Sequence, residues 1–184
     1  MKNMLCLMLV GGWFFWNSVS AQRLYNADKI TLTLFSEARL ENIEAASSKG
    51  SASIINADTR ELVFRTPIRS FSFEQKLMEE HFNENYMNSE KFPYAILKGK
   101  IVEDVDFTIE GLHQVTMNGI FTVHGITKQQ TVTGTILSKG GRLFLDAVFM
   151  LAVSDYQIKI PNDKISNISQ TIKITVHAEY LPKK

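Results

Sequence analysis

The sequence predicts an all-β fold, an antiparallel arrangement of about eight strands with one covering α-helix at about residues 72–87. Three observations lead to this prediction. Apolar and polar residues alternate with period two over most of the chain, which is typical of strands with one buried face. Turn-forming clusters separate these segments at short intervals. Only one segment has helical spacing. Many short strands with one helix favour a closed up-and-down barrel or a strongly bent sandwich.

The alternating segments define the predicted strands. In residues 114–124, for example, Val115, Met117 and Phe121 share one face, while Thr116 and Asn118 lie on the other. The strands are expected near residues 23–35, 51–57, 60–66, 94–103, 114–124, 129–138, 142–153 and 169–181. An eight-stranded barrel has an interior just large enough for packed side chains or for one ligand.

One turn has a specific signature. Gly125 and Thr127 lie between two alternating segments, in the run Gly-Ile-Thr-Lys that ends at Lys128. We expect them to build a tight strand–strand turn that uses the tolerance of glycine for positive φ. A β-branched residue in place of Gly125 would then be strained.

The expected helix begins with the form of a capping box. Ser72 is placed as the N-cap, and Gln75 follows three residues later, where its side chain could reach back. The apolar residues that recur at helical spacing are Phe73, Leu77, Met78, Phe82 and Tyr86. Pro93 forces the preceding residue out of helical dihedrals, so the helical segment must end before it.

The strand at residues 142–153 differs from the others because both of its faces are apolar. One face carries Leu143, Leu145, Ala147, Phe149 and Leu151, and the other is apolar except at Asp146. Antiparallel strands are apolar on both faces when both faces are covered. We expect one face to lie against a barrel interior. The other is expected to lie against the helix at residues 72–87 or against a second subunit in a homodimer.

The amino end has the three parts of a secretory signal. Lys2 is the only charge before Arg23, residues 4–16 are apolar apart from two glycines, and Val19-Ser20-Ala21 supplies the small residues of a cleavage site. The apolar run is shorter than the ~20 residues that cross a bilayer. We expect residues 1–21 to be a signal peptide and residues 22–184 to form one domain in the periplasm or outside the cell.

Without the predicted signal, the chain is formally neutral and contains no cysteine. Lys2 and the single cysteine, Cys6, both lie in the signal, which leaves 19 basic and 19 acidic residues. No disulfide is then available, so the core must stabilise the fold. Nucleic-acid binders usually carry a basic stripe, so a neutral chain argues against such a partner. No second apolar run reaches spanning length, and we expect no transmembrane segment in the mature chain.

No residue pattern predicts catalysis, a metal site or a cofactor. The four histidines are His81, His113, His124 and His177, and they show no His-Glu-x-x-His spacing. A zinc site needs three or four converging ligands. The sequence has no Gly-x-Ser-x-Gly nucleophile elbow, although a triad can assemble from residues that are distant in sequence. We expect a protein without enzymatic activity.

Alternation assigns one set of apolar side chains to the interior of the fold: Phe64, Ile96, Met117, Phe121, Leu145 and Phe149. A shared face does not by itself distinguish a packed core from the wall of a cavity, so both uses are open. Burial of apolar surface contributes ~25 cal/mol per Å2 in either case, to the stability of the fold or to a bound chain. As cavity wall, these six residues are the candidate ligand-binding residues.

Several segments resemble the YceI-like family of exported lipid- and polyisoprenoid-binding barrels. Residues 119–128 read Gly-Ile-Phe-Thr-Val-His-Gly-Ile-Thr-Lys, close to the family's Gly-x-Leu-Thr-x-x-Gly-Val-Thr-Lys. Residues 80–82, Glu-His-Phe, and 91–93, Lys-Phe-Pro, stand where the family has acidic-His-Leu and Tyr-Pro. Residues 155–158, Asp-Tyr-Gln-Ile, are a weaker counterpart of its Phe-Gly-Ile. The family's amino-terminal His-Ser pair is absent from residues 22–50.

The resemblance implies a lipocalin-like antiparallel barrel, exported to the periplasm, with an elongated apolar cavity for a polyisoprenoid or another lipid-like chain. By the same resemblance, His81 is a candidate contact of a ligand head group, beside a structural role in the helix. The alternative is a barrel with a filled core that acts through its surface, as an envelope-stress or interaction module. The volume of the interior distinguishes the two.

Overall fold

The computed structural model describes residues 22–164 and 166–183. The elements follow in this order: β1 (Leu24–Glu37), β2 (Asn42–Ser47), β3 (Ala52–Asn56), β4 (Glu61–Pro67), η1 (Ile68–Ser70), β5 (Ser72–Phe73), α1 (Lys76–His81), η2 (Phe82–Tyr86), β6 (Tyr94–Ile101), β7 (Gly111–Val123), β8 (Ile126–Lys139), β9 (Arg142–Ala152), η3 (Val153–Tyr156), η4 (Asn162–Lys164) and β10 (Thr171–Pro182). The predicted signal peptide lies outside the described residues, and its cleavage stays a prediction.

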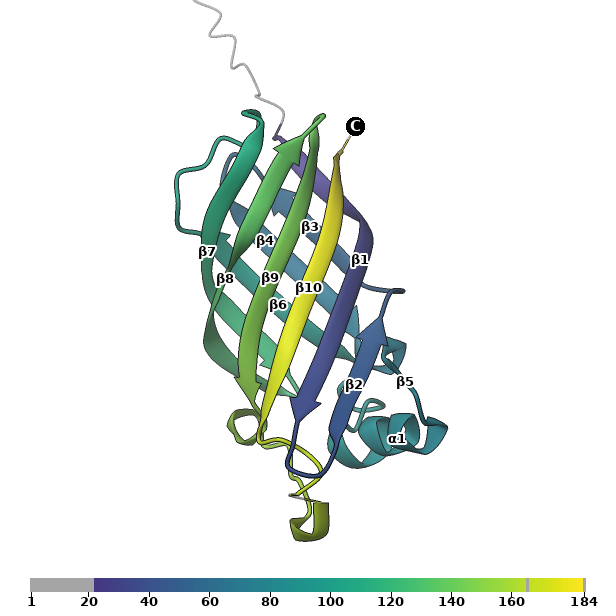
Figure 1. Cartoon of the computed structure of the whole chain (residues 1–184). Coiled ribbons are helices and arrows are strands. Elements are labelled where there is room, and N and C mark those ends of the chain that lie inside the picture. Colours follow the sequence, from purple (N-terminus) through teal and green to yellow (C-terminus); the bar gives the residue numbers. More distant parts are fainter. Residues whose placement is uncertain (1–21, 165, 184) are drawn as a thin grey trace, which may run out of the picture.

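Eight of the strands close into an antiparallel barrel (Figure 1). The order around the ring is β1, β10, β9, β8, β7, β6, β4 and β3, and the pairing of β1 with both β10 and β3 closes it. These eight strands are the ones that alternation predicts. Of the two architectures that the sequence left open, the barrel is confirmed, because a bent sandwich would leave two free edges.

β1 forms the seam of the barrel. One of its edges pairs with β10 from Tyr25 to Phe35. The other edge pairs with β3 only over Leu24–Asn26, and with β2 over Leu32–Glu37. β2 and β5, which alternation does not predict, therefore complete the wall at the end where β3 no longer reaches β1. Figure 1 shows β2, β5 and α1 together near the end of the barrel opposite the C-terminus.

The predicted helix exists, but it is shorter and begins later than expected. Ser72 and Phe73 pair with Ala46 and Ala45 as strand β5, so Ser72 is not a helix cap. The N-cap is Gln75, which makes no capping hydrogen bond through its side chain. α1 then covers only Lys76–His81 and continues as one π-helical turn, η2. The capping-box assignment was wrong because strand pairing holds the backbone of Ser72 extended.

The outer face of β9 is not covered by the helix, which corrects a second expectation. Val148 and Met150 point outward and are 49% and 54% exposed. α1 lies at one end of the barrel, away from the outer face of β9 (Figure 1). Asp146, on the same face, binds the imidazole of His177 on β10. Coverage of this face by a second subunit stays a prediction.

Two glycines allow β6 and β7 to approach closely. Gly99 and Gly119 are register partners on these strands. A Cβ on Gly119 would lie 2.1 Å from the carbonyl oxygen of Lys98, and one on Gly99 would lie 2.6 Å from that of Asn118. Contacts this short cannot exist, so the approach of the two backbones requires glycine at both positions.

The turn between β7 and β8 has the conformation expected for Gly125. His124 and Gly125 form the two-residue connection, with φ values of 52° and 75°. Positive φ at both central residues is the mark of a type I′ hairpin turn. Thr127 lies just beyond the turn on β8, where its hydroxyl shares a 2.8 Å hydrogen bond with that of Thr122 on β7.

Candidate ligand-binding cavity

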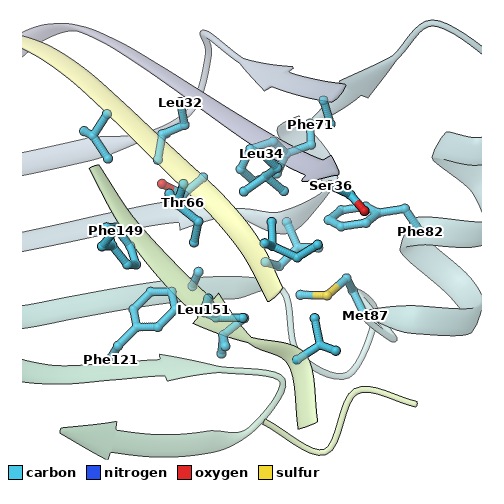
Figure 2. Close-up of a pocket in the computed structure, with 18 of the residues that line it drawn as sticks. Leu32, Leu34, Ser36, Thr66, Phe71, Phe82, Met87, Phe121, Phe149 and Leu151 are labelled. Atoms are coloured by element: carbon cyan, nitrogen blue, oxygen red, sulfur yellow. The ribbon is translucent and has the colours of Figure 1, made fainter. Parts of the chain in front are cut away.

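The barrel encloses a cavity of about 430 Å3 (Figure 2). Its wall is formed by inward-facing side chains of seven barrel strands, β1, β4, β6, β7, β8, β9 and β10. This volume falls within the range of ~300–1,000 Å3 that is typical of small-molecule sites. The interior is therefore not a filled core, and the alternating faces provide both packing and the wall of a cavity.

Five of the six interior residues predicted from the sequence line this cavity: Phe64, Met117, Phe121, Leu145 and Phe149. All five are buried, with exposed fractions between 5% and 8%. Figure 2 shows Phe121 and Phe149 side by side, and their rings meet edge to face with centroids 6.0 Å apart. The placement of these residues in the interior is confirmed, and their contact with a ligand stays a prediction.

Ile96 is the exception, and its assignment to the interior was wrong. In the register of β6, the neighbouring Leu97 stands opposite Phe121 and lines the cavity, as does Ala95. Side chains alternate between the two faces of a strand, so Ile96 lies on the outer face, opposite Arg65 of β4. Ile96 is therefore not a candidate ligand-binding residue.

The mouth of the cavity lies at the end of the barrel that carries α1. Its apolar lining comes from α1, η2 and the connection between β9 and β10, and includes Leu77, Met78, Phe82, Tyr86, Ile158, Ile160 and Ile168. The polar residues of this rim are Glu41, Gln75, His81, Lys164 and Asn167. His81 is exposed on this rim, and its contact with a ligand head group stays a prediction.

Polar groups inside the cavity already have partners. Thr66 is 3% exposed, and its hydroxyl accepts a hydrogen bond of 3.1 Å from Ser51. Ser36 is 6% exposed, and its hydroxyl accepts one of 2.8 Å from the backbone N–H of Ser169. A buried polar group without a partner costs free energy. These two hydroxyls are the buried polar groups of the described wall, which is otherwise mainly apolar and is suited to an apolar chain.

The phenol of Tyr86 at the mouth stays neutral. Burial, and after it the negative charge of Asp163, raises the pKa of Tyr86 above its ordinary value. Both effects disfavour the phenolate. Tyr86 therefore presents a hydroxyl group that can donate a hydrogen bond at any physiological pH.

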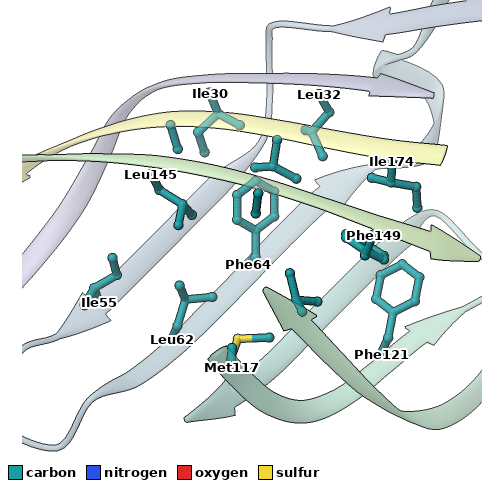
Figure 3. Packing of buried hydrophobic residues seen from close by; sticks show 14 of the residues in the cluster. Ile30, Leu32, Ile55, Leu62, Phe64, Met117, Phe121, Leu145, Phe149 and Ile174 are labelled. Carbon is teal, nitrogen blue, oxygen red and sulfur yellow. The ribbon is translucent and has the colours of Figure 1, made fainter. Parts of the chain in front are cut away.

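The opposite end of the barrel is packed shut. Tyr180, Ile55 and Leu143 are completely buried there, and none of them lines the cavity. The hydroxyls of Tyr180 and Ser53 are 2.7 Å apart, and burial strongly raises the pKa of Tyr180. Figure 3 shows Ile55 at one end of the cluster and Phe121 at the other. The cavity is thus a blind pocket with its mouth at the α1 end.

Residues from separate sequence motifs meet beside the cavity wall. His124 Nδ1 donates a 2.9 Å hydrogen bond to the carbonyl oxygen of Tyr156, which fixes the proton on that nitrogen because a carbonyl only accepts. The His124 ring meets that of Phe92 edge to face at 5.0 Å, and the Tyr156 ring meets that of Phe121 at 5.7 Å. The motif residues therefore support Phe121 in the wall.

Most of the mouth could not be predicted from sequence patterns. Helical spacing places Phe82 and Tyr86 on the apolar face of a helix and gives no role to Met87, although all three line the cavity. Ile158, Ile160 and Ile168 lie in a connection without regular periodicity. The spacing of isoleucines at 158 and 160 was the one available signal that this connection buries side chains.

Two kinds of feature are absent from the part of the chain that the structure describes. Across residues 22–164 and 166–183, no three His, Cys, Asp or Glu side chains are grouped so that they could hold a metal ion. Within the same residues, no helix has the length and apolar character needed to cross a membrane.

Comparisons with solved structures find the same fold. A polyisoprenoid-binding domain from Saccharophagus degradans, implicated in plant cell wall breakdown, has a TM-score of 0.73 at 12% identity, over 86% of this chain and 98% of that one. BcnA of Burkholderia cenocepacia gives 0.69 at 16% identity, over 82% and 95%. A YceI protein of Campylobacter jejuni gives 0.53 at 15% identity, over 100% and 99%.

The comparisons at the level of sequence agree with the architecture. A search of curated protein sequences gives no match. The YceI-like domain, in contrast, matches residues 26–180, which contain all eight barrel strands apart from the outer ends of β1 and β10. The resemblance predicted from residues 119–128 is thereby confirmed over almost the whole described chain. This chain belongs to the YceI-like family.

Proposed function

We propose that this chain is an exported binding protein that holds one polyisoprenoid or other lipid-like chain inside its barrel. The observation that carries the proposal is the blind, apolar cavity of about 430 Å3. Each methylene group that leaves water for such a site contributes ~0.8 kcal/mol. A chain of a few isoprene units could therefore bind without any polar contact in the interior. The signal-like residues 1–21 support export.

The distribution of polar groups supports a ligand with one polar end. The hydroxyls of Ser36 and Thr66 are the buried polar groups of the described wall, and each already accepts a hydrogen bond from the protein. Polar side chains that face the cavity gather at the mouth, among them His81 and Lys164. We place the apolar chain inside and its head group at this rim, where water and these side chains can solvate it.

Family membership supports the same class of ligand. The S. degradans domain of the same fold is described as polyisoprenoid binding. At 12% identity the likeness establishes the shared fold, so the ligand of this chain has to be argued from its own cavity. The apolar wall and the closed end of the cavity support an apolar chain as the ligand.

A surface-acting barrel with a filled core is less well supported, because the interior contains an open cavity. Binding is also favoured over catalysis. The buried polar side chains among the described lining residues are Ser36 and Thr66, and their hydrogen-bond partners are a backbone N–H and a serine, neither of which is a base. A hydroxyl nucleophile needs an adjacent base.

A pair of neighbouring substitutions on β6 tests the proposal. Ala95 lines the cavity, and Ala95→Trp fills the space inside, whereas Ile96→Trp places a tryptophan on the outer face. Delipidated residues 22–184 are titrated with farnesol, a prenyl alcohol of three isoprene units. Ala95→Trp should bind farnesol about tenfold more weakly or worse, because the indole takes the space of the ligand and buried contacts are lost. The affinity of Ile96→Trp for farnesol should stay within about twofold of that of the parent.

Tryptophan emission provides the control for these variants. Both native tryptophans lie in residues 1–21, so each variant of the mature chain has a single Trp. Emission should be blue-shifted for Ala95→Trp and less so for Ile96→Trp. Absence of farnesol binding to the parent, with no lipid in native mass spectra of protein from its own envelope fraction, would rule out the proposed function.

A further inference from the structure

On the neighbouring strands β9 and β10 the cavity ends within one inward position of the same level. On β9 the lining runs from Leu151 down to Leu145, and Leu143, the next inward residue, is packed. On β10 the lining ends at Val176, with Tyr180 beyond it completely buried. β3 contributes no described residue to the wall, because its inward Ser53 and Ile55 belong to the packed end. These residues form a floor.

The floor is fixed by hydrogen bonds as well as by packing. The Tyr180 hydroxyl lies 2.7 Å from that of Ser53, which donates a second hydrogen bond of 2.9 Å to the carbonyl oxygen of Val63. If a ligand pushed Tyr180 aside, its hydroxyl would lose its partner in an apolar environment, which is unfavourable. A longer chain therefore cannot easily displace the residues of the floor.

We propose that this floor limits the ligand to an apolar chain of about fifteen carbons, three isoprene units, inside the barrel, an inference that rests on the proposed function. A longer chain would have to leave its excess carbons outside the mouth. The floor residues, with Tyr180 and Leu143 at their centre, then set the chain length that this protein prefers.

The depth of the cavity gives one estimate of the length. The wall of β9 from Leu145 to Leu151 spans ~20 Å of strand, or ~15 Å along the axis of a barrel whose strands tilt by ~40°. An extended covalent chain advances ~1.2 Å per bond, since a peptide unit of three bonds spans ~3.5 Å. About twelve bonds fit, which is the main chain of about three isoprene units.

The volume gives a second, independent estimate. A dry apolar cavity of ~150 Å3 in another protein holds benzene, which corresponds to ~25 Å3 per carbon. At that density a cavity of about 430 Å3 holds about seventeen carbons. The estimates from depth and from volume agree to within a few carbons.

A chain-length series tests the inference on the parent protein. Delipidated residues 22–184 are titrated with prenyl alcohols of two, three, four and eight isoprene units, and with straight-chain alcohols of matched length. Affinity should rise more than about tenfold from two units to three, because five more carbons are buried. From three units to eight it should change by less than about threefold. Comparison with the straight-chain alcohols shows whether the protein prefers isoprenoid chains to fatty chains.

Two variants move the floor in opposite directions. Ala147 lines the cavity near the floor, so Ala147→Phe should shift the preferred length toward two units. Val148→Phe, one residue along the same strand on the exposed outer face, should leave the preference unchanged. Leu143→Ala opens space below the floor and should raise the affinity for four units relative to three.

The outcomes separate the inference from the proposed function. If no chain of any length binds the parent, the proposed function fails. If affinity keeps rising through eight units, or if Ala147→Phe and Leu143→Ala both fold and leave the preference unchanged, a lipid-binding role stands and the floor is not a length limit. If one variant does not fold, the other and the parent series still decide.

Discussion

Because Gly125 has no side chain, the Lys-Phe-Pro segment can pack against the turn between β7 and β8. Gly125 has a φ of +75°, and a Cβ at this position would lie 2.5 Å from Cε1 of Phe92. The aromatic ring of the Lys-Phe-Pro segment thus packs directly on the backbone of the turn. Glycine is needed for two reasons, the left-handed backbone and the space that the ring occupies.

Two glycine-to-alanine substitutions separate these reasons. A left-handed conformation costs a residue with a Cβ ~1–2 kcal/mol, and Gly140, with a φ of +57° and no atom within 4 Å of the place a Cβ would take, should show that cost alone. Gly125→Ala must also displace Phe92, so its free energy of unfolding should fall by ~2–4 kcal/mol. Chemical denaturation measures both. Equal losses at the two sites would exclude the contribution of Phe92.

The assignment of Ile96 shows where period-two reasoning fails. Residues 95–97 are all apolar, so alternation in this segment has no clear phase. Lys98 and Lys100 share the face of Ile96, whereas Ile101, 1% exposed, shares that of Leu97. The two lysines were a signal that the face of Ile96 is solvated. Met117 and Phe121 were predictable because they lie in a long alternating run whose other face is mostly polar, whereas the strand of Leu145 and Phe149 is apolar on both faces and only Asp146 indicated which face is solvated.

At the level of elements, the sequence indicates long strands well and short ones poorly. β2 (Asn42–Ser47) directs Ile43, Ala45 and Ser47 inward, and small or polar residues give no strong alternation. β5 has only two residues, and its pairing with β2 depends on a partner that is distant in sequence. The capping box at Ser72 was a sound local signal that tertiary pairing overrode. Elements held by distant partners could not be predicted from local pattern.

An acidic side chain completes the edge of β7 beyond the end of β6. Glu103 Oε2 accepts a 2.7 Å hydrogen bond from the backbone N–H of Thr116, where the ladder between the two strands has ended. This bond is the main reason that the pKa of Glu103 is lowered from its ordinary value of 4.5. The carboxylate of Glu103 thus provides the acceptor that a neighbouring strand would otherwise supply to the N–H of Thr116.

The lowered pKa gives this contact a defined pH dependence. A group whose pKa is lower in the folded state stabilises the fold above its unfolded pKa, and loses that contribution as pH falls through its folded pKa. Glu103→Gln removes the charge while keeping an acceptor oxygen. We expect the variant to be less stable than the parent near neutral pH, and the difference to shrink well below pH 4.5. A difference that is constant with pH in denaturation curves would exclude this role.

At the scale of the whole molecule, closure of the barrel was only half predictable. The eight strands and their antiparallel order follow from alternation and turns, but the seam depends on β1, which exchanges β3 for β2 along one edge. The boundary between cavity and packed end was also beyond the sequence. Leu143 and Leu145 belong to the same apolar face, yet only Leu145 lines the cavity. That difference depends on what the opposite wall contributes.

Export of the chain is a prediction for the whole molecule. The charged, apolar and small-residue parts of residues 1–21 should direct cleavage after Ala21. Protein recovered from the periplasm or the medium should then begin at Gln22. It should lack tryptophan fluorescence, because Trp13 and Trp16 are the two tryptophans of the sequence. A mature chain that retains Trp13 or Trp16 would contradict the prediction.

The closed end of the barrel limits how a ligand could enter and leave the cavity. Tyr180 and Leu143 close the far end, so the cavity that the described residues form has one mouth, at the α1 end. If the protein holds a lipid-like chain as proposed, that chain must leave through the mouth by which it entered. The barrel could then carry or store such a chain, but the chain could not pass through the barrel from one end to the other.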